Sequence, residues 1–194
     1  LVSGLVEYPG IYTLSGNSNV LQALNIAGGI KENGSLRYIE VKRDGNILKE
    51  IDLYDALILG NTSILGQLQS GDSIYIPAAK KLVRAGSGFA IEAMFELKDN
   101  ETIKDLLNFA GGTAINITED IFTVVSANKS GTYSIDFDSD EVNKYKLNNL
   151  DSLYVPVTEL GAVRIAGQIN RPGTYTINNG DTLYNIIKKA GGYS

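Results

Sequence analysis

The chain has 194 residues, 43% of them hydrophobic, and its 17 basic and 22 acidic residues give a net charge of −5. This composition is that of a globular protein, and the negative charge argues against nucleic acid or an anionic membrane as a partner. The chain has neither cysteine nor histidine. Disulfides, thiolate nucleophiles, cysteine-bound metals and His-containing catalytic triads are therefore excluded.

The first part of the chain predicts two strands followed by one main helix. A strand over 2–6 turns at Pro9-Gly10 and returns over 11–14, because proline presets φ and glycine accepts positive values. Gly28-Gly29 then supplies a left-handed helix stop. Between turn and stop, apolar residues recur at i, i+3, i+4 and i+7, the pattern of one helix face: Val20, Ala23, Leu24 and Ala27.

The next residues predict a hairpin, a short helix and a last strand. Alternating residues over 38–43 indicate a half-buried strand, and Asp44-Gly45-Asn46 predicts a tight turn into a second strand over 47–51. A short helix is expected over 52–59. The turn at Gly71-Asp72 leads into a strand over 73–76, which ends at Pro77.

This plan recurs along the chain. The motif Pro-Gly-x-Tyr followed by Ala-Gly-Gly appears again near the end, and in both copies the proline precedes the glycine pair by 19 positions (9 to 28 and 172 to 191). A middle copy ends at Gly111-Gly112, with Glu92-Ala93 in place of Pro-Gly and Phe95 in place of tyrosine. A second motif, Asp-Ser-Ile-Tyr-Ile-Pro or Asp-Ser-Leu-Tyr-Val-Pro, ends at Pro77 and Pro156. The repeat is therefore about 80 residues long.

We predict three units from this repeat: residues 1–79, a degenerate copy over 80–158, and the N-terminal part of a third copy over 159–194. Short connections without Pro- or Ser-rich linkers suggest that the units stack with limited relative motion. The third copy lacks its second half, and the sequence starts at Leu1 without a signal peptide. We therefore expect this chain to be a piece of a longer protein.

These motifs together resemble a known module. They are a glycine in the entry strand, Arg-Pro-Gly-x-Tyr at 171–175, a capped helix ending on Ala-Gly-Gly, and Gly-Asp-x-Ile-x-Ile-Pro at 71–77. The combination resembles the soluble-ligand-binding β-grasp (SLBB) domain, whose tandem copies are characteristic of the Wza-type outer-membrane polysaccharide export proteins. The resemblance covers nearly the whole chain and is weakest over 83–100.

The resemblance implies an α+β fold of tandem β-grasp-like domains, each a mixed sheet with one main helix. It implies a location in the periplasm, with attachment to the outer membrane through parts outside this sequence. The implied partners are a capsular polysaccharide or exopolysaccharide, further copies of the protein in a ring, and an inner-membrane polysaccharide copolymerase. It implies no cofactor, metal or catalytic residue, and the function is non-catalytic export.

Apparent catalytic and ligand motifs fail on inspection. The Ala-Gly-Gly segments follow helices, whereas phosphate binds at helix N-termini. Gly86 and Gly88 begin a dinucleotide-binding pattern, but Ile91 occupies its third glycine position. The aspartates at 136, 138 and 140 imitate a calcium loop, yet Glu141 and Leu147 stand where glycine and glutamate are needed. A pair of carboxylates could still cleave a glycan, but the sequence marks no such pair.

The turns carry the candidate contact residues. Tyr8, Tyr12, Arg171 and Tyr175 lie at or just after the repeated turn, where they could contact a glycan or a neighbouring subunit. For Tyr12 and Tyr175 we favour inward packing on the helix, because Phe95 replaces them in the second unit. The residues predicted to form structural turns and caps are Pro9, Gly10, Gly28, Gly29, Gly111, Gly112, Pro172, Gly173, Gly191 and Gly192.

Three functions remain open from the sequence. The leading hypothesis is the periplasmic part of a polysaccharide export channel, and the second is a free-standing periplasmic module that binds a glycan or small ligand. A carboxylate-based glycan enzyme is the third.

Overall fold

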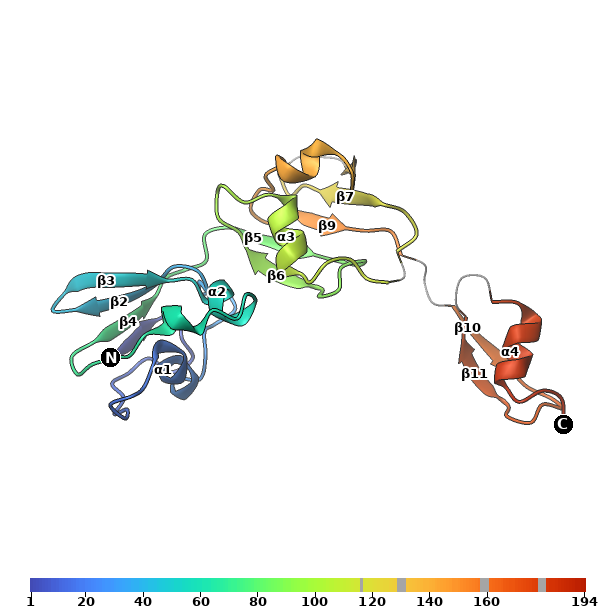
Figure 1. Ribbon diagram of the computed structural model, residues 1–194, viewed down its shortest axis with the longest axis horizontal. Coiled ribbons are helices and arrows are strands. Elements are labelled where there is room, and N and C mark those ends of the chain that lie inside the picture. The colour runs from blue at the N-terminus through green and yellow to red at the C-terminus, as the bar shows by residue number, and fades with distance from the viewer. Residues whose placement is uncertain (116, 129–131, 158–160, 178–180) are drawn as a thin grey trace.

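The computed structural model describes residues 1–115, 117–128, 132–157, 161–177 and 181–194 (Figure 1). The described residues form separate sheets in the first, second and third units, and each unit has its own hydrophobic cluster. The α+β fold of tandem β-grasp-like domains is confirmed: each sheet-and-helix unit follows the previous one along the chain. None of the helices in these ranges has the length and apolar character needed to cross a membrane.

The first unit is a mixed sheet with the order β1-β4-β2-β3. Strand β1 runs parallel to β4, and the other neighbours are antiparallel. Helix α1 buries Val20, Ala23 and Leu24, and its N-cap Asn19 forms a capping box with Gln22. The elements are β1 (Val2–Gly4), α1 (Val20–Ile26), β2 (Ile39–Arg43), β3 (Asn46–Ile51), α2 (Leu53–Leu57), the 3-10 helix η1 (Thr62–Leu65) and β4 (Ser73–Ile76).

One predicted strand of the first unit is wrong. Residues 11–14 form no strand, although Tyr12 and Leu14 still pack against the core. The antiparallel register at this point pairs Val2 with Gly10 as an isolated bridge. The Val2 and Gly10 backbones exchange two hydrogen bonds, and among the described residues no backbone bond continues this ladder along 11–14, so the pairing stops after one bridge.

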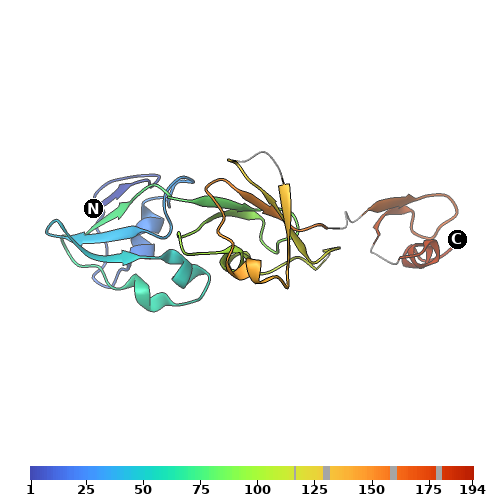
Figure 2. The same ribbon diagram turned by 90° about the horizontal axis from the view of Figure 1, so that it is seen from above.

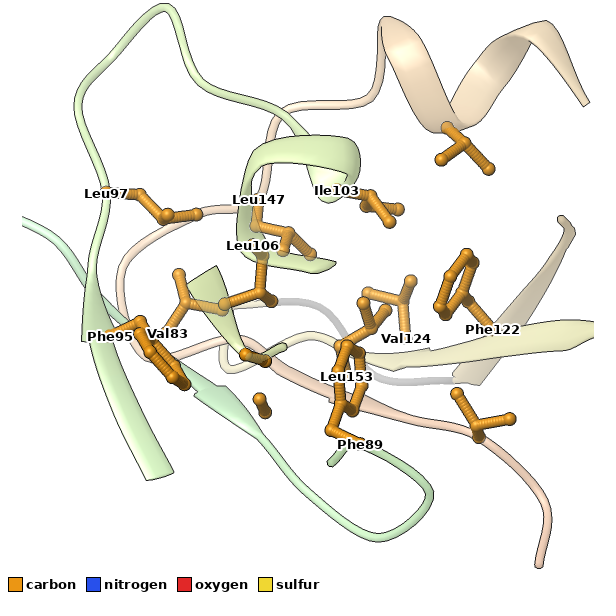
Figure 3. Packing of buried hydrophobic residues seen from close by; sticks show 14 of the residues in the cluster. Val83, Phe89, Phe95, Leu97, Ile103, Leu106, Phe122, Val124, Leu147 and Leu153 are labelled. Atoms are coloured by element: carbon orange, nitrogen blue, oxygen red, sulfur yellow. The ribbon is translucent and has the colours of Figure 1, made fainter. Parts of the chain in front are cut away.

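The second unit has the sheet order β6-β5-β9-β7-β8. Figure 3 shows the side chains of helix α3 and of strands β7 and β9 converging on its core, which includes the fully buried Leu106, Phe122 and Leu153. The polar stretch over 138–144 forms the 3-10 helix η2, anchored by the buried Val142. The elements are β5 (Leu82–Ala85), β6 (Ala93–Glu96), α3 (Ile103–Phe109), β7 (Ile121–Val125), β8 (Thr132–Asp136), η2 (Asp140–Asn143) and β9 (Ser152–Tyr154).

The third unit pairs β10 (Ala162–Ile165) with β11 (Gly173–Thr176) and covers them with α4 (Leu183–Lys189). Its cluster contains Ile165, Ile169, Ile186 and Ala190. In Figures 1 and 2 it lies apart from the first two units. The predicted boundary at 79/80 falls between β4 and β5, and the one at 158/159 lies outside the described residues. The division into three domains therefore stays a prediction.

The aspartate of the repeated motif ties a turn to a strand end in both units where it occurs. Asp72 accepts a hydrogen bond from the Gln69 backbone N–H and pairs with Arg43 at the end of β2. Asp151, which is fully buried, accepts from the Asn148 backbone N–H and from the Ser126 hydroxyl just after β7. Different partners thus satisfy the same carboxylate position.

The residue before this aspartate adopts a left-handed conformation. In the first unit it is Gly71, with φ of 90°, but in the second unit it is Leu150, with φ of 67° and a side chain that is 58% exposed. A leucine in this region of φ is strained, because its Cβ approaches the following carbonyl.

We expect Leu150→Gly to stabilise the second unit by about 0.5–1 kcal/mol, because relief of the strain outweighs the added flexibility of the unfolded chain. Urea unfolding followed by circular dichroism measures the change. The control is Leu48→Gly in β3, since Leu48 is similarly exposed at 51% and has no positive φ. That control should destabilise by about 1 kcal/mol, and a loss of stability in Leu150→Gly would contradict the strain.

Candidate functional site

The repeated turn packs against the C-terminal end of the main helix in all three units. The residue before the turn donates its backbone N–H to the carbonyl of the helix-terminal alanine. These bonds measure 2.9 Å in the first two units and 3.0 Å in the third, and join Tyr8 to Ala27, Ile91 to Ala110 and Arg171 to Ala190. The preceding residue donates to the second glycine in the same way, from Glu7 to Gly29, Ala90 to Gly112 and Asn170 to Gly192.

Both glycines of each pair have positive φ, between 74° and 93°. Only the first glycine lies under the turn. A Cβ on Gly28 would stand 2.7 Å from Tyr8 Cδ2 and 2.9 Å from Glu7 Cβ, whereas one on Gly29 would meet no described atom within 4 Å. Gly28 is therefore needed for backbone conformation and for close approach, whereas Gly29 is needed for conformation alone. The approach is looser in the other units, where a Cβ would stand 3.7 Å from Ala90 Cβ on Gly111 and 3.2 Å from Asn170 Cβ on Gly191.

Tyr12 and Tyr175 lie partly buried against the cores of their units. The hydroxyl of Tyr175 donates to the carbonyl oxygen of Arg171 at 2.6 Å, and the hydroxyl of Tyr12 donates to that of Tyr8. Each ring thus connects the core to the turn. Phe95 occupies the same strand position in the second unit, is 7% exposed and has no hydroxyl to make this bond.

The side chains before the turn point outward. Tyr8 is 68% exposed and Arg171 is exposed as well. The matching residue in the second unit is Ile91, at 53% exposure. The sequence does not mark Ile91 as a contact candidate, because the Pro-Gly pair is missing after it. Its match to Tyr8 is found by counting back four positions from Phe95, as from Tyr12 to Tyr8. The exposed position before the turn is therefore present in each unit and carries an aromatic, an aliphatic or a cationic side chain.

The structure does not bring the predicted contact residues into one site. Tyr8 and Tyr12 belong to the first unit, and Arg171 and Tyr175 to the third, which lie at opposite ends in Figure 1. Tyr12 borders a cavity of about 580 Å³, together with residues such as Ser15, Gln69 and Asp72. Its lining mixes apolar surface with hydroxyl, amide and carboxylate groups.

The calcium-like aspartates over 136–140 do not form a ligand set. Asp136 ends β8, and Asp140 begins η2 and pairs with Lys144 at 3.3 Å. Among the described residues, no group of three acidic side chains could hold a metal ion.

Comparison with known proteins agrees with the repeated geometry. The SLBB domain matches residues 2–49 and 162–194, which include the turns and glycine pairs of the first and third units. These two segments are therefore similar to the SLBB domain. Two sequences of the polysialic acid transport protein KpsD from Escherichia coli are each 37% identical over 76 residues. That stretch is 39% of this chain and 13% of KpsD, so the chain spans a small part of these relatives.

We predict that Gly28→Ala destabilises the first unit by about 2–4 kcal/mol and Gly29→Ala by about 1 kcal/mol. Both alanines are strained by positive φ, but only the first would overlap the turn. The two variants serve as controls for each other in urea unfolding. Equal losses would show that the turn does not rest on Gly28.

Proposed function

We propose that this chain is the SLBB region of a periplasmic protein that exports a capsular polysaccharide or an exopolysaccharide across the outer membrane. The observation that carries the proposal is that the SLBB match falls on the turn-and-cap geometry of two units, joined to the similarity with a polysialic acid transport protein. The proposed role is non-catalytic: the units make contacts within a ring of identical subunits and line or dock the export channel.

The exposed position before the turn is the proposed contact. A rigid turn held by backbone hydrogen bonds to the helix end presents Tyr8 and Arg171 without a large loss of side-chain or loop freedom on binding. Tyrosine and arginine are also the residues that most often dominate interfaces. The proposed partners are the polysaccharide, a neighbouring subunit and an inner-membrane copolymerase, with attachment to the outer membrane through other parts of the protein.

A free-standing glycan-binding module is the second candidate. The cavity of about 580 Å³ beside Tyr12 favours it, because small-ligand sites are concave and combine apolar walls with a few polar groups. This candidate predicts a monomer whose affinity for saccharide falls when Tyr12 is replaced, with export unaffected.

The complete gene product, expressed in its own host, tests the proposal. Tyr8→Ala and Arg171→Ala should reduce surface polysaccharide, and should weaken either subunit assembly or saccharide binding by about tenfold. The matched controls are Tyr184→Ala, whose tyrosine is 71% exposed on α4, and Lys188→Ala on the same helix.

Two measurements distinguish a contact between subunits from a contact with the glycan. The mass of the native oligomer reports subunit assembly, and titration of the purified chain with the exported saccharide reports glycan binding. The proposed contact would be refuted if Tyr8→Ala and Arg171→Ala both kept wild-type values of surface polysaccharide, oligomer mass and saccharide affinity. The non-catalytic role would be refuted if the protein cleaved the saccharide and replacing one acidic residue abolished that activity.

A further inference from the structure

Arg37 of the first unit is buried at the junction with the second unit. Although it belongs to a polar connection after α1, it is only 4% exposed. All five guanidinium N–H groups have acceptors: the Asp52 carboxylate, the Glu101 carboxylate and the Glu96 carbonyl. Asp52 belongs to the first unit, and both glutamates belong to the second. One guanidinium therefore joins carboxylates from the two units in the fork geometry that arginine favours.

Aromatic rings cover the faces of this guanidinium. Its carbon lies 4.5 Å from the centre of the Tyr54 ring and 5.0 Å from that of Phe109. The two rings contact each other edge to face at 5.0 Å, although Tyr54 comes from the first unit and Phe109 from the second. Tyr54 is 5% exposed and is part of the second unit's hydrophobic cluster. The junction is therefore a shared core as well as an ion pair.

Polar groups around the arginine also form hydrogen bonds between the two units. The buried carboxylate of Glu96 accepts hydrogen bonds from the Ser35 hydroxyl at 2.8 Å and from the Leu36 backbone N–H at 3.0 Å. The Glu96 backbone N–H donates in turn to the Tyr54 hydroxyl at 2.8 Å. Burial raises the pKa of Tyr54 to about 12, so the phenol stays protonated at neutral pH.

Asp52 is the carboxylate that the first unit contributes to this junction. Burial would raise the pKa of Asp52, but hydrogen bonds from Arg37 and from Lys98 of the second unit hold it below its ordinary value. The Lys98 ammonium lies 2.8 Å from the Asp52 carboxylate. Asp52 is thus paired with cations from both units, as a buried charge must be.

The next junction carries different chemistry at the matching positions. The backbone bond from Ser35 to Pro77 recurs from Thr118 to Pro156, which places Asp120 where the first unit has Arg37. Strand register and the helix ends give the other matches: Asp138 for Tyr54, Thr176 for Glu96 and Lys189 for Phe109. Lys189 pairs within the third unit, at 2.7 Å from Asp181. At this junction an aspartate therefore takes the place of the arginine, and charged side chains take the places of both aromatic rings.

We infer that Arg37 clamps the first two units into one rigid body, and that the third unit is oriented independently of them. Separating the units would leave the buried charge of Glu101 without Arg37, its cation from the first unit, so partial opening of the junction is costly. The turns at Tyr8 and Ile91 are then held at a constant spacing, whereas the turn at Arg171 is not. A subunit or ligand could engage the first two turns as a preformed pair.

Pulsed electron–electron double resonance, which measures the distance between two spin labels, tests the inference on the 194-residue chain. Because the chain has no cysteine, spin labels can be placed only where cysteines are introduced. One exposed residue in each unit is replaced for labelling: Asn46→Cys in the first, Asn143→Cys in the second and Lys188→Cys in the third. We expect a narrow distance distribution between labels at 46 and 143 and a broad one between 143 and 188.

Arg37→Met should broaden the distribution between 46 and 143 by about twofold or more, because Glu101 loses the cation that links it to the first unit and Asp52 keeps only Lys98. The control is Arg43→Met, which breaks the ion pair of Arg43 with Asp72 inside the first unit and should leave the width unchanged. Glu101→Gln, which keeps the side-chain shape and removes its charge, replaces Arg37→Met if that variant fails to fold.

Two results would overturn the inference. One is an unchanged width between 46 and 143 in every folded variant. The other is a wild-type distribution between 143 and 188 as narrow as that between 46 and 143.

Discussion

The packing of a turn onto the end of a helix is the interaction on which each unit depends. A short helix of seven residues has little stability of its own, so it needs tertiary contacts at its face and its ends. Here the turn supplies two backbone N–H groups to carbonyls at the helix C-terminus that would otherwise lack partners. The same contact sets the position of the first strand pair relative to the helix, and hence the shape of the core.

That contact also supports the proposal that the turn takes part in recognition. Its backbone is held from below by the helix end, and in the first and third units a tyrosine hydroxyl holds it from the core. The side chain before the turn is then free to vary, as tyrosine, isoleucine and arginine do at this position. A scaffold that keeps the backbone constant while the exposed group changes suits a protein whose units meet different surfaces.

Sequence analysis predicted the elements with strong local signals. Helix stripes, glycine stops and the hairpin at Asp44-Gly45 depend on residues close together in the chain, and the helices and strands formed within a few residues of the predicted bounds. The strand over 11–14 was wrong because strand formation needs a ladder partner, and pairing is a property of two segments. The role of Arg37 was missed for a similar reason: in the sequence it is one charged residue in a polar connection, and its partners Glu96 and Glu101 lie about 60 positions away.

The sequence by itself determined the repeat, the positions of the main helices, the α+β class and the resemblance to SLBB domains, because turn residues, caps and apolar periodicity act over a few neighbouring residues. Only the tertiary structure decided that Ile91 takes the exposed position before the turn of the second unit, that two tyrosine hydroxyls bind the turn backbone, and which charged residues are buried between units. These outcomes depend on burial, and burial is set by the packing of segments far apart in the chain.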